Sequence, residues 1–531
     1  MTETCTTTAL TKSEADQFIQ AIQHRWFYQM YMDDLPVWGM VGEFMTKGEV
    51  LKVAEKSDLA RLDHLSSDVS DFSNLDPYVY TKRQLKIKYN KDQIVQVDLH
   101  SEPTSLVKVE VGAKLSFELN VSWEETNAEF HSRFDRYLDH DFFKHPIHWF
   151  SVFNSFMMVL FLSGLVALIL LRTLRKDYAK YGMIEEGEFD DDEKAKLVNN
   201  PDQDTGWKLV HGDVFRAPLF LPLLSSIIGT GYQLLALGMA VIIFCFLGPL
   251  HGGHVHEERG EVWHAIIVCY SLSSVVAGYT SGRFFRKYSQ KKKTSLWQAV
   301  MGLTVLLLPT VAVGILSILN GISLYYGTIN TIPFLVIIKL FFIWVFFSVP
   351  LCIAGTLLGR HSTDSPFPCR VNAIPRPIPD DVPWYGTPAG LVPLAGLLSF
   401  GSIFIELYYV LTSLWNYKYY HVYGFLLGVL FILILVVSMT SMIVVYFLLN
   451  AENYHWQWTA VAAGGMTGVY VWWYGVYYFI FKTAMHGMLQ TAFYFGYTTV
   501  LALVVSLVCG VIGHGAAAAF CFTIFQNVKV D

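Results

Sequence analysis

The sequence predicts an α-helical polytopic membrane protein with nine transmembrane helices and an N-terminal, mainly β luminal domain. Apolar residues make up 53% of the chain and charged residues 15%, against roughly 25% charged residues in an ordinary soluble domain. The apolar residues are concentrated after residue 146, in long runs separated by short polar breaks. Residues 1–146 instead intersperse charged and apolar positions, as a soluble domain does.

Residues 1–146 contain three stretches in which apolar side chains recur at every second position. The residues that carry this alternation are Leu85, Ile87 and Tyr89, then Val107, Val109 and Val111, then Leu115, Phe117, Leu119, Val121 and Trp123. A period of two is typical of strands with one buried face. The pattern predicts antiparallel strands arranged as a small sandwich.

The N-terminal domain also carries features of the secretory pathway. Asn120-Val121-Ser122 is an N-glycosylation sequon, which makes Asn120 a candidate glycosylation site on the luminal side. Residues 1–18 lack the apolar core of a signal peptide, and Cys5 has no partner cysteine within 1–146. Both features predict that the chain is truncated at its N-terminus. The alternative is that the first span translocates the domain and Cys5 stays reduced.

The remainder of the chain contains nine apolar runs, each long enough for a helix of about 20 residues to cross the hydrocarbon core. They lie near 147–171, 219–250, 262–282, 297–320, 332–358, 386–414, 422–449, 458–481 and 489–522. The predicted organisation is a luminal domain (1–146), a first transmembrane helix (147–171), a loop (172–218), an eight-helix bundle (219–522) and a tail (523–531).

Lys and Arg are concentrated in alternate loops, which sets the orientation of the spans. The basic loops follow the first, third and fifth spans, at 172–216, 283–293 and 360–376. Basic residues stay on the cytosolic side of short loops. This asymmetry predicts a luminal N-terminal domain and a cytosolic C-terminus. The basic segment 283–293 is a candidate contact for anionic membrane lipids, or a topology determinant alone.

Two kinds of residue within the spans suggest specific contacts. Glycines recur at helix-packing spacing at Gly278 and Gly282, at Gly464 and Gly468, and at Gly510, Gly513 and Gly515. They predict close packing within the bundle or, alternatively, a groove for another transmembrane segment. Lys339 and Glu406 are charged residues at matched depths in the fifth and sixth spans. We expect them to form an ion pair, as a structural lock or as a functional pair, because an unpaired intramembrane charge is costly.

The sequence shows no motif of a common catalytic site. It lacks the nucleophile elbow, the phosphate-binding loop, the zinc-protease signature and a dinucleotide-binding motif after a strand. We therefore expect no enzyme activity, no cofactor and no metal site, and the loop with His251, His254 and His256 is interpreted as solvated. The dispersed net charge of −6 predicts no nucleic-acid partner.

Several long segments resemble the transmembrane nine superfamily, or nonaspanins. They include WFYQMYMDDLPVWGMVGE (26–43), HWFSVFNSFMMV (148–159), LRTLRKDYAKY (171–181), GWKLVHGDVFR (206–216), FPCRVNAIPRPIP (367–379), FGSIFIELYYVLTSLW (400–415), YFLLNAENYHWQWTA (446–460), YFGY (494–497) and the terminal NVKVD. The resemblance extends from Cys5 to Asp531. Within that family, the sequence is most similar to member 3. The departures are the missing signal peptide and first luminal segment, and an expanded stretch at 44–76.

The resemblance implies residence in Golgi and endosomal membranes and a part in the sorting or surface delivery of other membrane proteins. It also implies that Lys529 and Asp531 form a retrieval signal that binds coat proteins. Two function classes remain open. One is a non-enzymatic protein that sorts membrane-protein cargo by recognising its transmembrane segments. The other is a transporter or channel for a small solute, ion or lipid.

Overall fold

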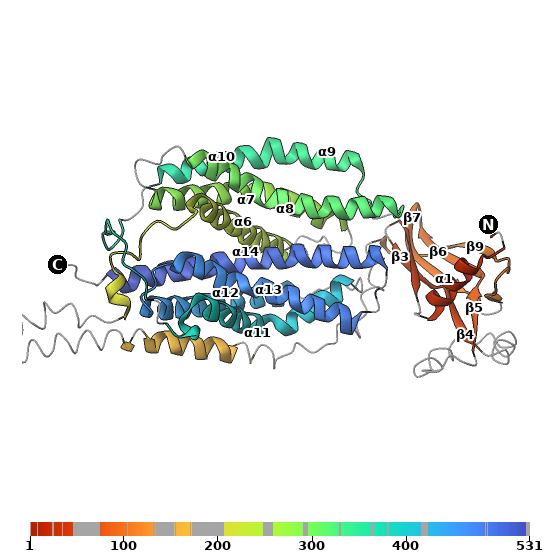
Figure 1. The fold of residues 1–531 in the computed structure, drawn as a ribbon. Helices are drawn as coiled ribbons and strands as arrows, with labels where there is room; N and C mark the ends of the chain where they lie inside the picture. Colours follow the sequence, from red (N-terminus) through yellow and green to blue (C-terminus); the bar gives the residue numbers. More distant parts are fainter. Residues whose placement is uncertain are drawn as a thin grey trace, which may run out of the picture. The chain divides into compact units, whose positions relative to one another are not determined.

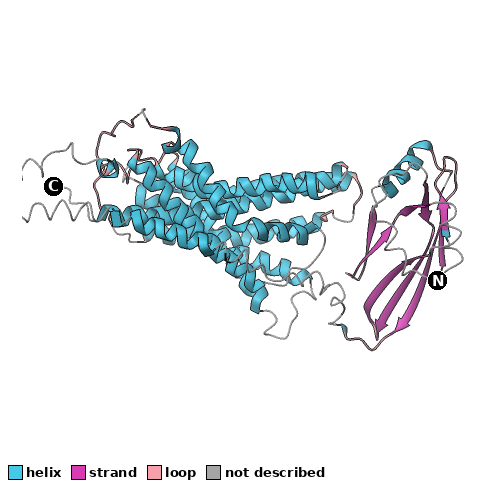
Figure 2. Ribbon diagram, turned by 90° about the horizontal axis from the view of Figure 1, so that it is seen from below, coloured by secondary structure: helices cyan, strands magenta, loops and turns pink. Residues whose placement is uncertain are grey.

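The computed structural model divides the chain into two compact units, Met1–Phe143 and Lys144–Asp531 (Figure 1). It describes residues within 2–45, 75–133, 153–172, 206–247, 259–289, 296–362, 366–415 and 423–526, apart from short gaps inside these ranges. Figure 2 shows strands and one helix in the first unit and helices throughout the described part of the second. This agrees with the predicted fold class.

The first unit contains three small sheets. The largest has the order β1-β9-β6-β7, formed by Thr2–Thr6, Ser116–Glu125, Lys82–Asn90 and Gln93–Ser101. The others are β2-β3 (Phe27–Met32 and Leu35–Met40) and β4-β5-β8 (Gly42–Met45, Asp76–Tyr80 and Leu106–Lys108). The alternation predicted around Leu85 and Leu119 is confirmed by β6 and β9. These two strands pair in parallel, which the expectation of antiparallel strands missed.

Two apolar cores hold this unit together. In one, Leu35 and Val37 of β3 pack with Leu85 and Ile87 of β6, so the two-stranded sheet covers the larger one. In the other, the helix α1 (Lys12–Gln23) buries Ile22 and its neighbours against the sheet β4-β5-β8. The second core depends on a short amphipathic helix that a period of two does not reveal.

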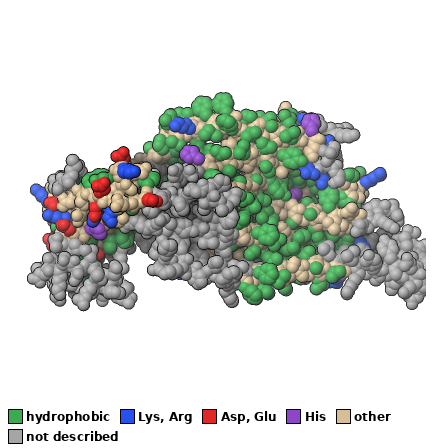
Figure 3. Space-filling view, turned by 180° about the vertical axis from the view of Figure 1, so that it is seen from behind, with side chains coloured by type: hydrophobic (Ala, Val, Ile, Leu, Met, Phe, Trp, Pro, Cys, Tyr) green, Lys and Arg blue, Asp and Glu red, His purple; other side chains and the backbone are tan. Residues whose placement is uncertain are grey.

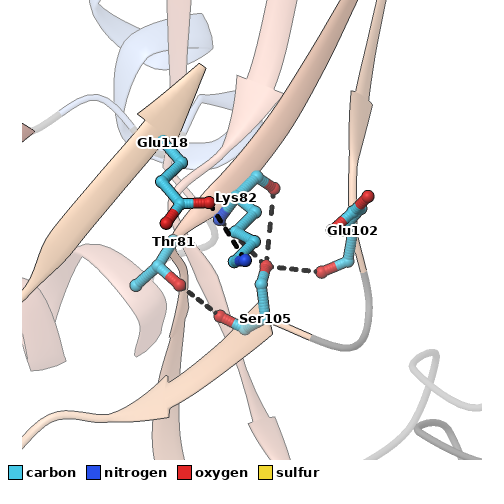
Figure 4. Close-up of polar contacts among 5 residues, drawn as sticks. All are labelled: Thr81, Lys82, Glu102, Ser105 and Glu118. Carbon is cyan, nitrogen blue, oxygen red and sulfur yellow. Dashed lines mark hydrogen bonds and ion pairs between the residues drawn. The ribbon is translucent and has the colours of Figure 1, made fainter. Parts of the chain in front are cut away.

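Polar contacts fix the point where β5 passes into β6 (Figure 4). Thr81 donates its hydroxyl to the carbonyl oxygen of Ser105 at 2.6 Å, and the Ser105 hydroxyl donates to the carbonyl of Glu102 at 2.7 Å. Lys82 forms a 3.0 Å ion pair with Glu118 on the parallel strand β9. The hydrogen bond to Glu118 raises the pKa of Lys82. These contacts tie the loop before β8 to the centre of the largest sheet.

The second unit consists of long helices that match the predicted spans. They are α6 (Leu221–Leu247), α7 (Arg259–Tyr288), α8 (Trp297–Tyr325), α9 (Phe334–Ile343), a π-helical turn η9 (Trp344–Ser348), α10 (Val349–His361), α11 (Pro388–Trp415), α12 (Tyr423–Asn450), α13 (Trp456–Lys482) and α14 (Met488–Gln526). A shorter apolar helix, Phe156–Ile169, lies within the first predicted span. The segment α9-η9-α10 occupies a single predicted span.

Seven of the described helices are long and apolar enough to cross a membrane, judged by length and composition. The exception among the long helices is α13, which carries many Trp, Tyr and Gly residues. It is nonetheless among the most enclosed helices, because it packs extensively against α14 and α11. With 39 residues, α14 is about 58 Å long at roughly 1.5 Å per residue, so it exceeds a hydrocarbon core of about 30 Å.

The glycine pairs pack helices inside the unit, as one of the two interpretations predicted. A Cβ on Gly282 of α7 would lie 2.7 Å from the carbonyl oxygen of Thr356 on α10. A Cβ on Gly468 of α13 would lie 2.6 Å from the backbone nitrogen of Ser506 on α14. Only glycine permits such close approach of two backbones. These positions therefore clamp α7 to α10 and α13 to α14.

Candidate functional site

One end of the helical unit brings together segments that are far apart in the sequence. This is the end at which α14 finishes, and we call it the motif end. Here 206–216, 367–379 and the α12–α13 turn at 450–458 meet the last turns of α14. These are three of the segments that carry the family resemblance. Their convergence makes the motif end the best candidate for a functional site.

An apolar core forms the base of the motif end. The 3₁₀ helix η6 (Gly206–Val210) and the turn after it bury Trp207 and Phe215. The Phe215 ring stacks on Phe367 with a centroid distance of 5.1 Å, and Trp207 contacts Phe525 of α14 edge-on at 5.2 Å. Aromatic rings in such arrangements bury large apolar areas. The loop 206–216 is thus held as part of the bundle.

Asp213 is the polar centre of the motif end and is only 2% exposed. Its Oδ1 accepts a hydrogen bond from Nε of Arg216 at 3.0 Å, and its Oδ2 accepts the backbone N–H of Arg376 at 3.2 Å. Arg216 also donates to the carbonyl of Asn372 at 2.8 Å, and the backbone N–H of Asn372 donates to the carbonyl of Gly212. Buried carboxylates are stable only when paired and hydrogen-bonded. Asp213 therefore fastens 206–216 to 367–379.

A second ion pair extends this connection to the α12–α13 turn. Nη2 of Arg376 lies 3.0 Å from Oε2 of Glu452, and both side chains remain partly exposed. Glu452 has a φ of +58°, a left-handed conformation that costs energy for a residue with a side chain. The ion pair fixes this turn against the proline-rich segment that contains Arg376.

The first turn of α13 binds the carbonyl groups that lead into α6. The indole N–H groups of Trp456 and Trp458 donate to the carbonyls of Val214 and Leu219, both at 2.8 Å. Between them, Gln457 donates to the carbonyl of Arg216 at 3.3 Å. Chain segments outside a helix leave their carbonyls without helical partners. The sequence Trp-Gln-Trp supplies those partners.

Behind Trp456 lies His514 of α14, a fully enclosed imidazole. Its ring stacks on Trp456 with a centroid distance of 5.6 Å and meets Phe284 of α7 edge-on at 5.3 Å. It is 4% exposed, and its Nε2 has no hydrogen-bond partner among the described residues. His514 therefore joins α7, α13 and α14 below the motif end.

The polar groups of the motif end bind one another, so the arrangement is that of a rigid joint between loops and helix ends. Within the described ranges no group of three or more His, Cys, Asp or Glu side chains is placed to hold a metal ion. In the sequence these segments are recognisable only by their resemblance to the family, and nothing in them predicts that they meet. A usable signal was present, because long motifs in loops often mark function.

Comparison with known proteins gives the family. Residues 1–488 match the profile of Endomembrane protein 70. The chain belongs to this family. It is 33% identical to Transmembrane 9 superfamily member 4 of Arabidopsis thaliana over 98% of the chain and 82% of that relative. It is 34% identical to member 3 of the same plant over the same shares, and 35% identical to member 2 of Mus musculus over 82% of the chain and 62% of the relative. No solved structure matches the chain.

In this transmembrane 9 superfamily protein, two further sites predicted from the sequence are the C-terminal retrieval signal and the glycosylation site. Lys529 and Asp531, the predicted retrieval signal, lie outside the described residues. Asn120 lies within β9, half-buried and paired with Thr2 and Gln84 of the neighbouring strands. Glycosylation at Asn120 stays a prediction.

The described part of the basic segment 283–293 contacts protein. Arg286 of α7 donates to the carbonyls of Arg360 and Ser362, the latter at 2.8 Å. The Lys287 ammonium lies 4.0 Å from the ring centroid of Phe522 on α14. These cations therefore fasten α7 to α10 and α14. Residues 290–293 lie outside the described ranges, and lipid binding by this segment stays a prediction.

The structure does not bring Lys339 and Glu406 together. Lys339 lies on α9 with an exposed side chain, and no ion pair joins it to another described residue. Glu406 lies half-buried on α11, which packs against α12 and α13. Figure 1 shows α9 and α11 on opposite sides of the helical unit. Matched depth allows contact only between neighbouring helices, and these two are neighbours in sequence but not in space.

Proposed function

We propose that this protein acts without enzymatic activity in the sorting or surface delivery of other membrane proteins, by binding their transmembrane segments. It works in Golgi and endosomal membranes, with the N-terminal domain in the lumen and the C-terminus in the cytosol. Lys529 and Asp531 bind coat proteins and return it to the Golgi. The resemblance of the sequence and the shape of the helical unit both support this function.

The observation that carries this proposal is the uneven burial of the helices. In α8 and in the segment α9–α10, only 11% of the apolar stretch is buried, against 33–39% in α6, α7, α11, α12 and α14. Apolar side chains cover much of the visible surface of the helical unit in Figure 3, whereas the visible acidic side chains gather on the β-rich unit and basic ones appear on both. A wide apolar face within the membrane suits contact with other transmembrane helices.

The experiment is to remove the protein from cells and measure which membrane proteins change in surface abundance. We expect a subset of single-pass and multi-pass proteins to be lost from the surface, and re-expression of the full chain to restore them. Chimeras that exchange only the transmembrane segment between an affected and an unaffected protein then test recognition. If the dependence does not follow the transmembrane segment, the proposal fails.

A second candidate function, transport of a small solute or ion, is favoured by one observation. The buried Nε2 of His514 and the buried Oγ of Ser441 on α12 have no hydrogen-bond partner among the described residues. Ser441 meets α14 at Gly513, the residue before His514, because a Cβ on Gly513 would contact Ser441 Oγ. Buried polar atoms in this situation usually bind water. The test is proton or ion flux into liposomes that contain the protein. Flux that is lost in His514→Ala would support transport.

A further inference from the structure

The fifth predicted span is built from two halves that differ sharply in packing. The half formed by α10 is clamped to α7, with Cys352, Gly355, Thr356 and Gly359 buried. The half formed by α9 has no buried residue at all. Phe334, Leu335, Val336 and Ile337 are 76%, 63%, 40% and 42% exposed. Four consecutive residues cover the full circumference of a helix, and Ile338 and Ile343 are only partly covered, so no face of α9 is buried within the described part of the unit.

The junction between the halves is irregular. Trp344–Ser348 forms a π-helical turn, and Pro350 follows at the start of α10. A π-helical turn widens the helix by one residue, and proline removes a backbone hydrogen bond. Both weaken the mechanical coupling between α9 and α10. The fifth span thus combines a fixed half with a half that is free to meet a further helix.

Lys339 places a positive charge on the exposed half of the span, and this charge favours a partner that carries a carboxylate. It lies five residues after Phe334, the first residue of α9, and its side chain is exposed among Phe341, Phe342 and Leu340. A lysine within a transmembrane helix ordinarily faces a partner or the bundle interior, because an intramembrane charge is costly. Here the described chain supplies no carboxylate to it. A carboxylate on another helix at this depth would neutralise it.

We propose that α9 is a docking site for a transmembrane helix that carries an Asp or Glu at the depth of Lys339. The aromatic and aliphatic side chains of α9 provide the apolar contact, and Lys339 provides selectivity by charge complementarity. The inference rests on the proposed sorting function and specifies the class of cargo. Proteins whose transmembrane segment has an acidic residue in this leaflet are expected to be bound in preference to those that lack one.

Site-specific photocrosslinking in the full chain tests the proposal. A photoreactive phenylalanine analogue is placed at Phe341 of α9, which is 57% exposed, or at Phe431 of α12 as a control. Phe431 matches Phe341 in exposure and in position along its helix. It is 61% exposed and lies eight residues after the first residue of α12, and Phe341 lies seven residues after the first residue of α9. The probe is a co-expressed single-pass protein with a Leu/Ala transmembrane helix and one Glu at the depth of Lys339.

We expect crosslinks from position 341 to this probe, reduced about five-fold when the probe Glu is replaced by Gln or when the chain carries Lys339→Gln. Crosslinking should return when Lys339→Glu is combined with a probe that carries Lys. The yield of crosslinks from position 431 should not depend on the charge of the probe. Equal crosslinking of the Glu and Gln probes, or crosslinks from position 341 to lipid alone, would overturn the inference.

A parallel measurement separates this inference from the proposed function. Surface delivery of affected proteins is compared in cells with the original chain, with Lys339→Gln and without the protein. The expected result is that Lys339→Gln impairs delivery only of proteins with an acidic transmembrane residue. If loss of the protein impairs delivery and Lys339→Gln does not, sorting stands and the α9 site is refuted. If neither has an effect, the proposed function itself fails.

Discussion

Trp456 donates its indole N–H to the carbonyl oxygen of Val214 at 2.8 Å, across 242 residues of sequence. We predict that Trp456→Phe destabilises the helical unit by about 1–3 kcal/mol, because a buried carbonyl loses its donor. Thermal unfolding of the purified protein in detergent measures the effect. Trp207→Phe is the matched control, since Trp207 is buried in the same core. An equal loss in both variants would mean that volume, not the hydrogen bond, determines stability.

Asp213 should be the most sensitive polar residue of the motif end. Asp213→Ala leaves Arg216 without its buried carboxylate and frees the segment around Arg376. Breaking a buried pair costs about 3 kcal/mol, and we expect earlier protease cleavage in the segments 206–216 and 367–379. Glu452→Gln is the control, because its partner Arg376 is 40% exposed and a partly exposed pair contributes at most about 1 kcal/mol. Unchanged protease resistance in Asp213→Ala would contradict the assignment.

The contact between α7 and α10 predicts a steric effect at Gly282. A valine there would force its side chain against the Thr356 carbonyl, which lies 2.7 Å from the Cβ position. Overpacking of this kind costs about 1–3 kcal/mol, and we expect a lower midpoint of thermal unfolding. Gly302→Val on α8 has open space around the Cβ position and should change the midpoint much less. A similar shift in both variants would show that helix propensity alone is responsible.

The hydrogen bonds between Thr11 and Glu14 at the start of α1 predict that the stability of this helix depends on pH. Glu14 accepts hydrogen bonds from the backbone N–H and hydroxyl of Thr11, both at 2.8 Å. These bonds lower the pKa of Glu14 below its usual value of 4.5. A depressed carboxyl pKa stabilises the folded state above the unfolded pKa, and this is lost as pH falls through the folded pKa. The protection factors of the α1 amides against hydrogen exchange should fall below about pH 4.5 in the original chain. In Glu14→Gln this acid-dependent step should be absent.

We predict that the localisation of the protein depends on Lys529 in its C-terminal tail. Replacing Lys529 with Ala removes the cation expected to bind coat proteins, and we expect the protein to move from the Golgi towards the cell surface. Fluorescence microscopy and coat-protein pull-down with the tail peptide measure this. The control is Asn527→Ala, which changes the same tail without altering its charge. Golgi residence in Lys529→Ala, with coat binding retained, would contradict the retrieval signal.

The boundaries of the helices were predictable because the bilayer fixes their length and apolarity. The run at 422–449, for example, became Tyr423–Asn450. Helix neighbours were not predictable, because apolar faces of similar composition pack in many ways. Lys339 and Glu406 therefore stand apart despite matched depth. Only glycine spacing, as at Gly278 and Gly282, carried information on which surfaces approach closely.

The motif end was visible in the sequence only as separate motifs. Nothing local to Asp213 indicates that it accepts the N–H of Arg376, which is 163 residues away. In the N-terminal unit, alternation located β6, which buries Leu85 and Ile87, and β9, whose partly buried Leu119 and Val121 pack against the same core. The short strands β3 to β5 bury irregular positions, and α1 has only three buried residues. Such segments carry too little periodicity to be recognised without their tertiary partners.

The composition of α13 has a consequence for how the protein is made. This helix contains too many Trp, Tyr and Gly residues to rank with the apolar spans, so on its own it has a weak tendency to leave the translocon for lipid. Its partner α14 follows after only a short turn and binds it through Gly464, Gly468 and Ser506. The two helices are therefore expected to enter the bilayer together as a hairpin, and truncation before α14 should leave α13 poorly inserted.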